Sequence, residues 1–168
     1  MNRTISIRLA VFTLGFSLLS TALAVEEGEQ APDFTLTSIH ENQPDFTLSQ
    51  LRGKVVYLDF WASWCAPCLL SLPLYNELYE KYRDRGLEIV GINIDDPIED
   101  GLDFLLDTPL DFTIPADPDG ETPTLYDVYG MPTSYLIDQQ GVIRLVHEGF
   151  REGDIEMIEQ QINALLDQ

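Results

Sequence analysis

The two cysteines of the chain, Cys65 and Cys68, are separated by two residues in the segment WASWCAPC. Thiols at this spacing can close a small disulfide ring. An apolar run precedes the segment and a helical pattern follows it, so Cys65 would lie at the positive end of a helix dipole, beside free backbone N–H groups. Both features favour the thiolate and move a cysteine pKa from about 8.5 into a range of about 3.5 to 7.5. We therefore expect Cys65 to be the attacking sulfur and Cys68 the resolving one.

Two other uses of the cysteine pair have less support. An inert structural disulfide would add little stability, because the loop that it closes is short. A metal site would need further ligands, and the two histidines, His40 and His147, stand in unrelated segments. The pair therefore favours redox catalysis, with no metal and no cofactor.

The segments around the pair predict strands that alternate with helices. Two near-continuous apolar runs, at 55–61 and 87–94, are typical of strands buried on both faces. Helical spacing of apolar residues follows from Ala66 to Arg83. Further expected elements are short strands at 31–36, 46–48 and 112–114, a helix that begins at the cap sequence 95–97, helical turns at 124–129, a hairpin of 134–138 and 142–147, and a last amphipathic helix over 155–165. Together they predict an α/β fold with a mixed central β-sheet flanked by helices.

Acidic residues dominate the composition. The 168 residues include 29 Asp and Glu but only 9 Lys and Arg, which gives a formal net charge of −20. Such acidity argues against nucleic acid as a partner and against anionic membrane surfaces. The length and a hydrophobic content of 45% suit one folded domain with a full core.

The first 24 residues have the pattern of a secretory signal peptide. Arg3 and Arg8 precede 16 uncharged residues, which end in the small-x-small sequence ALA at 22–24. An uncleaved membrane anchor is the alternative, but the uncharged stretch is shorter than the roughly 20 residues that a spanning helix needs. We expect residues 1–24 to be removed and residues 25–168 to form the domain, in an exported, oxidising compartment such as the periplasm.

The WASWCAPC segment is one part of a wider pattern. It is joined by APDF at 31–34, by Pro73 five residues after the second cysteine, and by GMPT at 130–133. Together these motifs resemble the thioredoxin superfamily, and in particular the exported TlpA/ResA-like thioredoxins, over nearly all of the chain after residue 24. The resemblance implies a thioredoxin fold with an N-terminal β extension. It also implies a central helix–strand insertion, for which the segment 95–114 is the match.

The resemblance also implies which residues bind the client protein. Pro132 matches the family's cis-proline, which would face the cysteines and leave the backbone of Met131 free to pair with an extended client segment. Trp64, Ala66 and Pro67 would contact the client beside the attacking sulfur. The alternatives are an ordinary trans proline in a turn, and a Trp64 that covers the core.

Asp59 is the one charged residue of the apolar run before the cysteines. It matches a buried aspartate of thioredoxins, whereas many TlpA/ResA relatives have asparagine there. Burial raises the pKa of a carboxyl group, so Asp59 could accept the proton of Cys68, through water, when that thiol resolves a mixed disulfide. A strand-end aspartate that faces solvent is the alternative.

Two positions depart from the family pattern. ResA-like reductants have a glutamate three residues after the second cysteine, where this chain has Ser71. The haem-maturation branch often has a glutamate directly after the cis-proline, where this chain has Thr133. Both differences weaken the case for a specific role in cytochrome c maturation.

Four functions are compatible with the sequence. The leading hypothesis is an exported thiol–disulfide oxidoreductase that reduces protein disulfides and receives electrons from a membrane thiol donor. An oxidase or isomerase would use the same residues at a different redox potential. A thiol peroxidase is suggested by the APDFTL opening, which peroxiredoxins share, but Ala62 stands where a peroxidatic cysteine is preceded by Thr or Ser. A non-enzymatic binding or chaperone module that uses the acidic surface is the fourth.

The acidic residues are concentrated in one half of the chain. No Lys or Arg occurs between Arg85 and Arg144, whereas 13 acidic residues lie between Glu88 and Asp138. A solvated acidic face would keep an exported monomer soluble. It could also select a basic exported client, such as a c-type cytochrome, through electrostatic steering.

Overall fold

The computed structural model describes residues 25–40 and 43–168, and the predicted signal peptide lies outside them. One mixed sheet has the strand order β2-β1-β5-β4-β3-β6-β7. Neighbours β3–β4 and β4–β5 are parallel and the other neighbours are antiparallel, so the predicted mixed sheet is confirmed. The strands are β1 (Thr35–Ser38), β2 (Phe46–Thr47), β3 (Val55–Trp61), β4 (Leu87–Asn93), β5 (Pro115–Ala116), β6 (Thr133–Ile137) and β7 (Ile143–Glu148).

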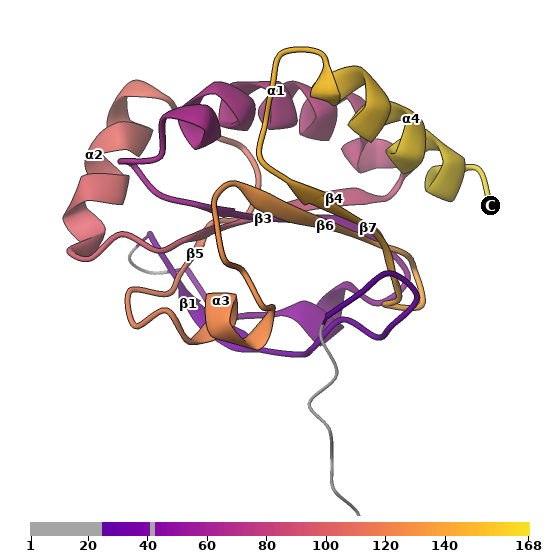
Figure 1. Cartoon of the computed structure of the whole chain (residues 1–168), viewed down its shortest axis with the longest axis horizontal. Coiled ribbons are helices and arrows are strands. Elements are labelled where there is room, and N and C mark those ends of the chain that lie inside the picture. The colour runs from indigo at the N-terminus through magenta and orange to yellow at the C-terminus, as the bar shows by residue number, and fades with distance from the viewer. Residues whose placement is uncertain (1–24, 41–42) are drawn as a thin grey trace, which may run out of the picture.

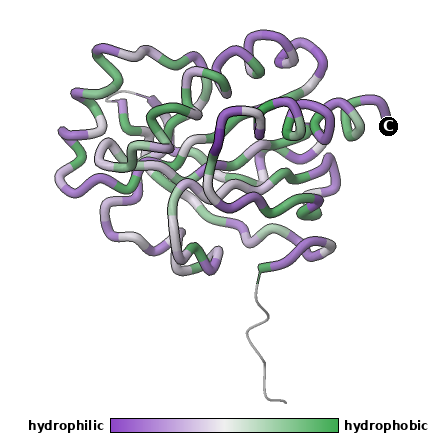
Figure 2. The backbone as a smooth tube through the Cα atoms, turned by 45° about the horizontal axis from the view of Figure 1, so that its top comes forward, coloured by the Kyte–Doolittle hydropathy of each residue, from purple (hydrophilic) through white to green (hydrophobic). Residues whose placement is uncertain are grey.

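Helices cover both faces of the sheet, with α1 and α4 on one side and α3 on the other (Figure 1). Hydrophobic and hydrophilic residues alternate along the helical coils (Figure 2), as expected of helices that bury one side. The terminal hairpin β6–β7 and helix α4 lie where the sequence predicts them. The helices are α1 (Ala66–Tyr82), α2 (Ile98–Asp107), α3 (Glu121–Leu125) and α4 (Asp154–Leu166), with short 3-10 helices η1 (Leu48–Leu51) and η2 (Arg83–Arg85).

Strand β3 separates two hydrophobic cores. All seven of its residues are buried, and successive side chains point to opposite faces. Tyr57 and Trp61 pack in the core beneath α1 and α4, whereas Leu58 and Phe60 pack in the core on the α3 side. Asp59 lies two residues from both Tyr57 and Trp61, so its side chain points to the same face of the sheet as theirs. Its carboxyl group therefore points toward α1, the helix that begins beside the cysteines.

The edge of the sheet beyond β4 contains the N-terminal extension and the insertion. Strand β1 pairs with both β2 and β5, which confirms the predicted N-terminal β extension. The strand predicted at 112–114 is wrong in its bounds, because only Thr113 pairs with β4, through a single isolated bridge. Phe112 and Ile114, on either side of it, are buried core residues. Continuous pairing begins at β5 instead.

The helical turn predicted at 124–129 also lies earlier in the chain, in α3. Asp127 has a φ of 55°, in the left-handed region, which a right-handed helix does not continue through. Tyr126 is buried, and its hydroxyl donates to the Pro32 carbonyl at 2.7 Å. The chain after Tyr126 is therefore a loop, and it brings Tyr129 to the surface beside the cysteines.

Candidate active site

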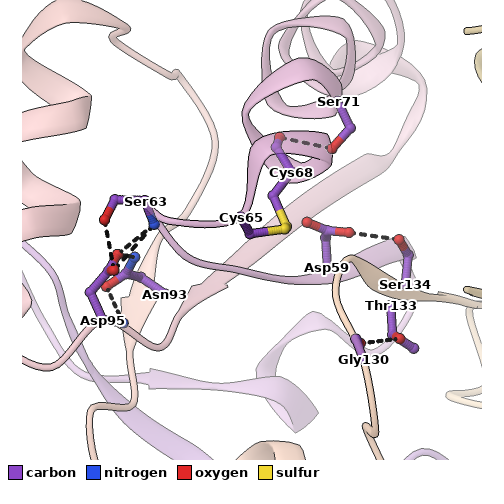
Figure 3. The surroundings of a disulfide bond; sticks show 10 residues. All are labelled: Asp59, Ser63, Cys65, Cys68, Ser71, Asn93, Asp95, Gly130, Thr133 and Ser134. Atoms are coloured by element: carbon purple, nitrogen blue, oxygen red, sulfur yellow. Dashed lines mark hydrogen bonds between the residues drawn. A yellow bond between two sulfur atoms is a disulfide. The ribbon is translucent and has the colours of Figure 1, made fainter. Parts of the chain in front are cut away.

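Cys65 and Cys68 form a disulfide where the chain passes from β3 into α1 (Figure 3). Their Cα atoms are 5.3 Å apart. Cys65 is the N-cap residue of α1, and Pro67 lies in its first turn. The Cys65 N–H donates to the Ala62 carbonyl at 3.1 Å, and the Cys65 carbonyl accepts the Leu69 N–H at 3.1 Å. These bonds fix the backbone on both sides of the first sulfur.

The two cysteines differ in their access to a client. Cys65 borders a surface groove, whereas Cys68 is fully buried behind it. A client disulfide can therefore reach Cys65 first, and the helix N-terminus favours a thiolate there. The geometry is the one that the predicted roles of attacking and resolving sulfur require, although those roles remain predictions.

The groove beside Cys65 has a volume of about 500 Å³. Trp64, Ala66, Pro67 and Met131, all predicted to contact a client, line it. Trp64 is 68% exposed and does not cover the core, in contrast to the fully buried Trp61. Sequence reasoning missed several apolar lining residues, which share no motif with the cysteines. They are Ile94, Pro123, Val128 and Tyr129, of which Tyr129 is 93% exposed.

The loop before β6 forms one wall of the groove. The peptide bond between Met131 and Pro132 is cis, as the resemblance predicts. Pro132 itself is buried behind Met131, and its carbonyl accepts the Gly149 N–H at 2.7 Å. The structure thus places Met131 in contact with the groove and Pro132 just behind it. Pairing of the Met131 backbone with a client remains a prediction.

Asp59 lies beneath the disulfide and is fully buried (Figure 3). The Ser134 hydroxyl donates to its Oδ1 at 2.6 Å, whereas Oδ2 has no hydrogen-bond partner among the described residues. Burial raises the pKa of Asp59 to about 7, and the bond from Ser134 opposes this shift. The alternative of a solvent-facing Asp59 is wrong. A carboxyl group that titrates near neutral pH can accept and return a proton under physiological conditions.

A second buried carboxylate fixes the loop before Cys65, and sequence reasoning missed it. Asp95 accepts the backbone N–H of Ser63 at 2.9 Å, the Ser63 hydroxyl at 2.8 Å, and the Asn93 side-chain amide at 2.6 Å (Figure 3). The cap predicted at 95–97 does not form through a side chain, because α2 begins at Ile98 without a side-chain cap. Polar residues that alternate with apolar ones at the end of a buried strand were the available signal.

Ser71 and Thr133, the two residues that depart from the family pattern, each bind a backbone carbonyl nearby. The Ser71 hydroxyl is buried and donates to the Cys68 carbonyl at 3.0 Å. The Thr133 hydroxyl donates to the Gly130 carbonyl at 2.8 Å. At these two positions the side chains stabilise the backbone, and neither supplies a carboxyl group to the site.

Two kinds of feature are absent from residues 25–40 and 43–168, which the structure describes. In this part of the chain no group of three or more His, Cys, Asp or Glu side chains is arranged to hold a metal ion. No helix in the same residues has the length and hydropathy needed to cross a membrane.

A thioredoxin-like sheet with a Cys-x-x-Cys disulfide at the start of its first long helix defines a class of protein, the thiol–disulfide oxidoreductases. The comparisons agree with this class. Residues 27–146 match the AhpC/TSA family. The chain therefore belongs to this family within the thioredoxin superfamily, and it is a thiol–disulfide oxidoreductase similar to the ResA proteins.

Two relatives and one solved structure illustrate the similarity. The thiol-disulfide oxidoreductase ResA of Oceanobacillus iheyensis is 39% identical over 129 residues, which are 73% of this chain and 65% of that protein. ResA of Bacillus cereus is 33% identical over 92% of this chain and 87% of its own length. A crystal structure from Chlorobium tepidum, provisionally named a thiol:disulfide interchange protein DsbE, is 47% identical. It has a TM-score of 0.81 and covers 85% of this chain and 99% of its own.

Proposed function

We propose that the protein is an exported disulfide reductase. The Cys65 thiolate attacks a client disulfide and forms a mixed disulfide. Cys68 then gives its proton to Asp59 and attacks Cys65, and the client leaves as a thiolate with the electron pair of the broken bond. The reduced client is released, and the Cys65–Cys68 disulfide must be reduced again by a thiol donor, which we place in the membrane.

One observation supports the reducing direction: the buried Asp59 carboxyl group beside the buried Cys68. Strong oxidants of this class owe their potential to a reduced form that is stabilised. An ionised carboxylate disfavours a thiolate nearby, because like charges repel. Asp59 therefore acts against a stabilised thiolate on Cys68, and this favours a low redox potential and the reductase.

The same residues could run the reaction in the other direction as an oxidase or isomerase. Reduction of insulin by the purified protein, in a thiol buffer of defined potential, distinguishes these functions. We expect the protein to reduce insulin at potentials where a strong oxidant would remain reduced and inactive. Oxidation of a reduced client in the same buffer would favour the alternative function.

The client itself can be captured through Cys65. In a Cys68→Ser variant the mixed disulfide cannot be resolved, so exported client proteins should accumulate as covalent adducts that thiol reductants release. A Cys65→Ser/Cys68→Ser variant is the matched control and should trap nothing. Absence of adducts from Cys68→Ser in the exported fraction would contradict the reductase. Unchanged client activity with the double variant would support the non-enzymatic binding module.

The acidic surface supports a basic client. Helix α2 exposes Glu99, Asp100, Asp103 and Asp107. The helix lies beside the turn that leads from β3 into α1 (Figure 1), and Asp95, just before it, binds that turn. We propose that this acidic face steers cationic exported proteins, such as c-type cytochromes, toward the groove. The rate with a trapped client should fall as salt is added, and a salt-independent rate would contradict steering.

We further propose that residues 1–24 are a signal peptide and that the mature protein is a monomer. The sequence supports export, because a basic start and an apolar stretch precede a small-x-small site. Sequencing of the N-terminus of the exported protein should give Val25 as its first residue. Recovery of the protein in the membrane fraction with its leader intact would favour an anchor instead.

A further inference from the structure

Ser134 on β6 is the register neighbour of Asp59 on β3. Both residues are fully buried, and the serine hydroxyl donates to Asp59 Oδ1 at 2.6 Å. With Oδ1 bound to Ser134, the other carboxyl oxygen lies on the side of the disulfide (Figure 3). No motif in the sequence identifies Ser134, because the two partners are 75 residues apart in the chain.

The strand on the other side of β3 cannot provide Asp59 with a side-chain partner. The register neighbour there is Gly91 on β4. A Cβ atom at Gly91 would lie 3.0 Å from the Phe112 ring and 3.3 Å from the Trp61 indole nitrogen, so a larger residue would crowd these rings. Ser134 is therefore the one in-register neighbour of Asp59 that can donate a hydrogen bond from its side chain.

Among the described residues, Ser134 is the side chain that binds the Asp59 carboxyl group directly, and the nearby titratable groups do not. Cys68 lies beside it at the start of α1 (Figure 3), and the charge of Asp59 acts on Tyr75 of α1 and on Tyr57, two residues away on β3. The two tyrosine hydroxyls share a hydrogen bond of 3.4 Å, and burial raises the pKa of both, so they stay neutral. On β7, His147 is paired with Ser134 in register, and its Nε2 lies 3.4 Å from Asp154 on α4. The ion pairs of the described residues do not include Asp59.

We propose that Ser134 is a positioning residue of the redox reaction, because it binds one oxygen of Asp59 and thereby keeps the other directed at the buried sulfur. This inference rests on the proposed role of Asp59. In the resolving step the Cys68 proton moves to Asp59, directly or through a water molecule. A bond forms between the sulfurs of Cys68 and Cys65, and the Cys65–client bond breaks, with its electron pair on the client thiolate. Without the serine hydroxyl, the carboxyl group can rotate and its ionised form loses a donor.

The pH profile of the resolving step distinguishes positioning from a merely structural role. A hydrogen bond to an ionised group typically changes a pKa by about one unit or more. Ser134→Ala should therefore shift the midpoint of the profile to higher pH and slow the step about tenfold near neutral pH. The loss should be smaller at high pH, because Asp59 is ionised there in both proteins and only the freedom of its carboxyl group to rotate still slows the variant. A structural defect would lower the rate at every pH and leave the midpoint unchanged.

The test uses the full mature protein with a mixed disulfide between Cys65 and 2-nitro-5-thiobenzoate, whose release by Cys68 is followed by stopped-flow absorbance. Ser134→Thr retains the hydroxyl and should keep the wild-type midpoint. Ser134→Val is its isostere without the hydroxyl and should show the shift. This pair gives the same comparison if Ser134→Ala does not fold.

A double variant shows whether Ser134 acts through Asp59. We expect Ser134→Ala to have no further effect on the profile of Asp59→Asn. An equal slowing in both backgrounds would overturn the positioning role and leave the role of Asp59 intact. A wild-type profile for Asp59→Asn alone would instead overturn the proposed role of Asp59, and the inference about Ser134 with it.

Discussion

Two buried carboxyl groups lie on either side of the active-site turn, and their surroundings differ. Asp95, before Cys65, accepts three hydrogen bonds from Ser63 and Asn93. Asp59, behind Cys68, accepts one hydrogen bond and leaves its second oxygen without a partner among the described residues. Neither belongs to an ion pair of these residues. The two differ in how fully their oxygens are bound.

This difference indicates a structural role for one carboxyl group and a role in proton transfer for the other. A carboxylate whose oxygens are bound by several donors holds its partners in place. A carboxylate with an unbound oxygen in an apolar site gains stability by taking up a proton. We infer that Asp95 fixes the loop in front of the attacking sulfur, and that Asp59 exchanges a proton with the resolving one.

The largest expected effect is on the pH dependence of stability. Burial raises the pKa of Asp59 from 3.8 to about 7, so the folded protein binds a proton that the unfolded chain releases in this range. Asp59 therefore destabilises the fold increasingly as pH rises from about 4 to 7, by up to about 4 kcal/mol. Relative to wild type, oxidised Asp59→Asn should gain about this much stability over that range in urea unfolding. A pH-independent difference would show that Asp59 ionises normally.

Asp95→Ala should destabilise the protein, whereas Asp59→Asn should stabilise it. Loss of Asp95 leaves the Ser63 N–H and the Asn93 amide without their acceptor, and the free energy of unfolding should fall by about 3 kcal/mol. Equilibrium urea unfolding of the oxidised protein measures this change. Ser63→Ala, which keeps the backbone donor, is the matched control and should be closer to wild type. A wild-type stability for Asp95→Ala would show that the hydrogen bonds of Asp95 do not hold the loop.

How much of this site could be predicted depends on the distance in sequence between partners. The cysteine pair follows from its own spacing, the buried strands from their apolar runs, and the cis-proline from the family resemblance, and the structure confirms their positions. The hydrogen bonds from Ser63 to Asp95 join residues 32 positions apart, and the bond from Ser134 to Asp59 joins residues 75 positions apart. The polar–apolar alternation that leads to Asp95 indicates a buried polar group, but no local signature identifies the partners of either carboxyl group. The side-chain cap predicted at 95–97 is wrong, because Ser63 and Asn93 bind the oxygens of Asp95 instead.

Asp59→Asn should slow the resolving step about a hundredfold at pH above 7, because a general base typically contributes at least this much. Release of 2-nitro-5-thiobenzoate from Cys65 measures the step. Asp95→Asn removes the charge of the other carboxylate and should leave the pH midpoint unchanged. Equal slowing and an equal shift in both variants would mean that the two carboxyl groups do not have separate roles.

The smallest expected effect is on client association. Glu99→Gln/Asp103→Asn on α2 should slow the reaction with a cationic disulfide peptide about threefold at low salt, through weaker steering. Glu152→Gln/Glu156→Gln removes two charges near the start of α4, away from α2 (Figure 1), and is the matched control. Both variants should react normally with a neutral disulfide. Equal slowing by the two pairs would indicate a general charge effect rather than an α2 binding face.

Titration of Asp59 itself shows most directly whether this carboxyl group can accept the proton of Cys68. The carboxyl carbon of Asp59 can be followed by NMR as pH is changed in the oxidised protein, with Asp59→Asn to assign the signal. We predict a midpoint near 7, because the group is buried with a single hydrogen bond. A midpoint near 4 would contradict the role of Asp59 as the proton acceptor for Cys68.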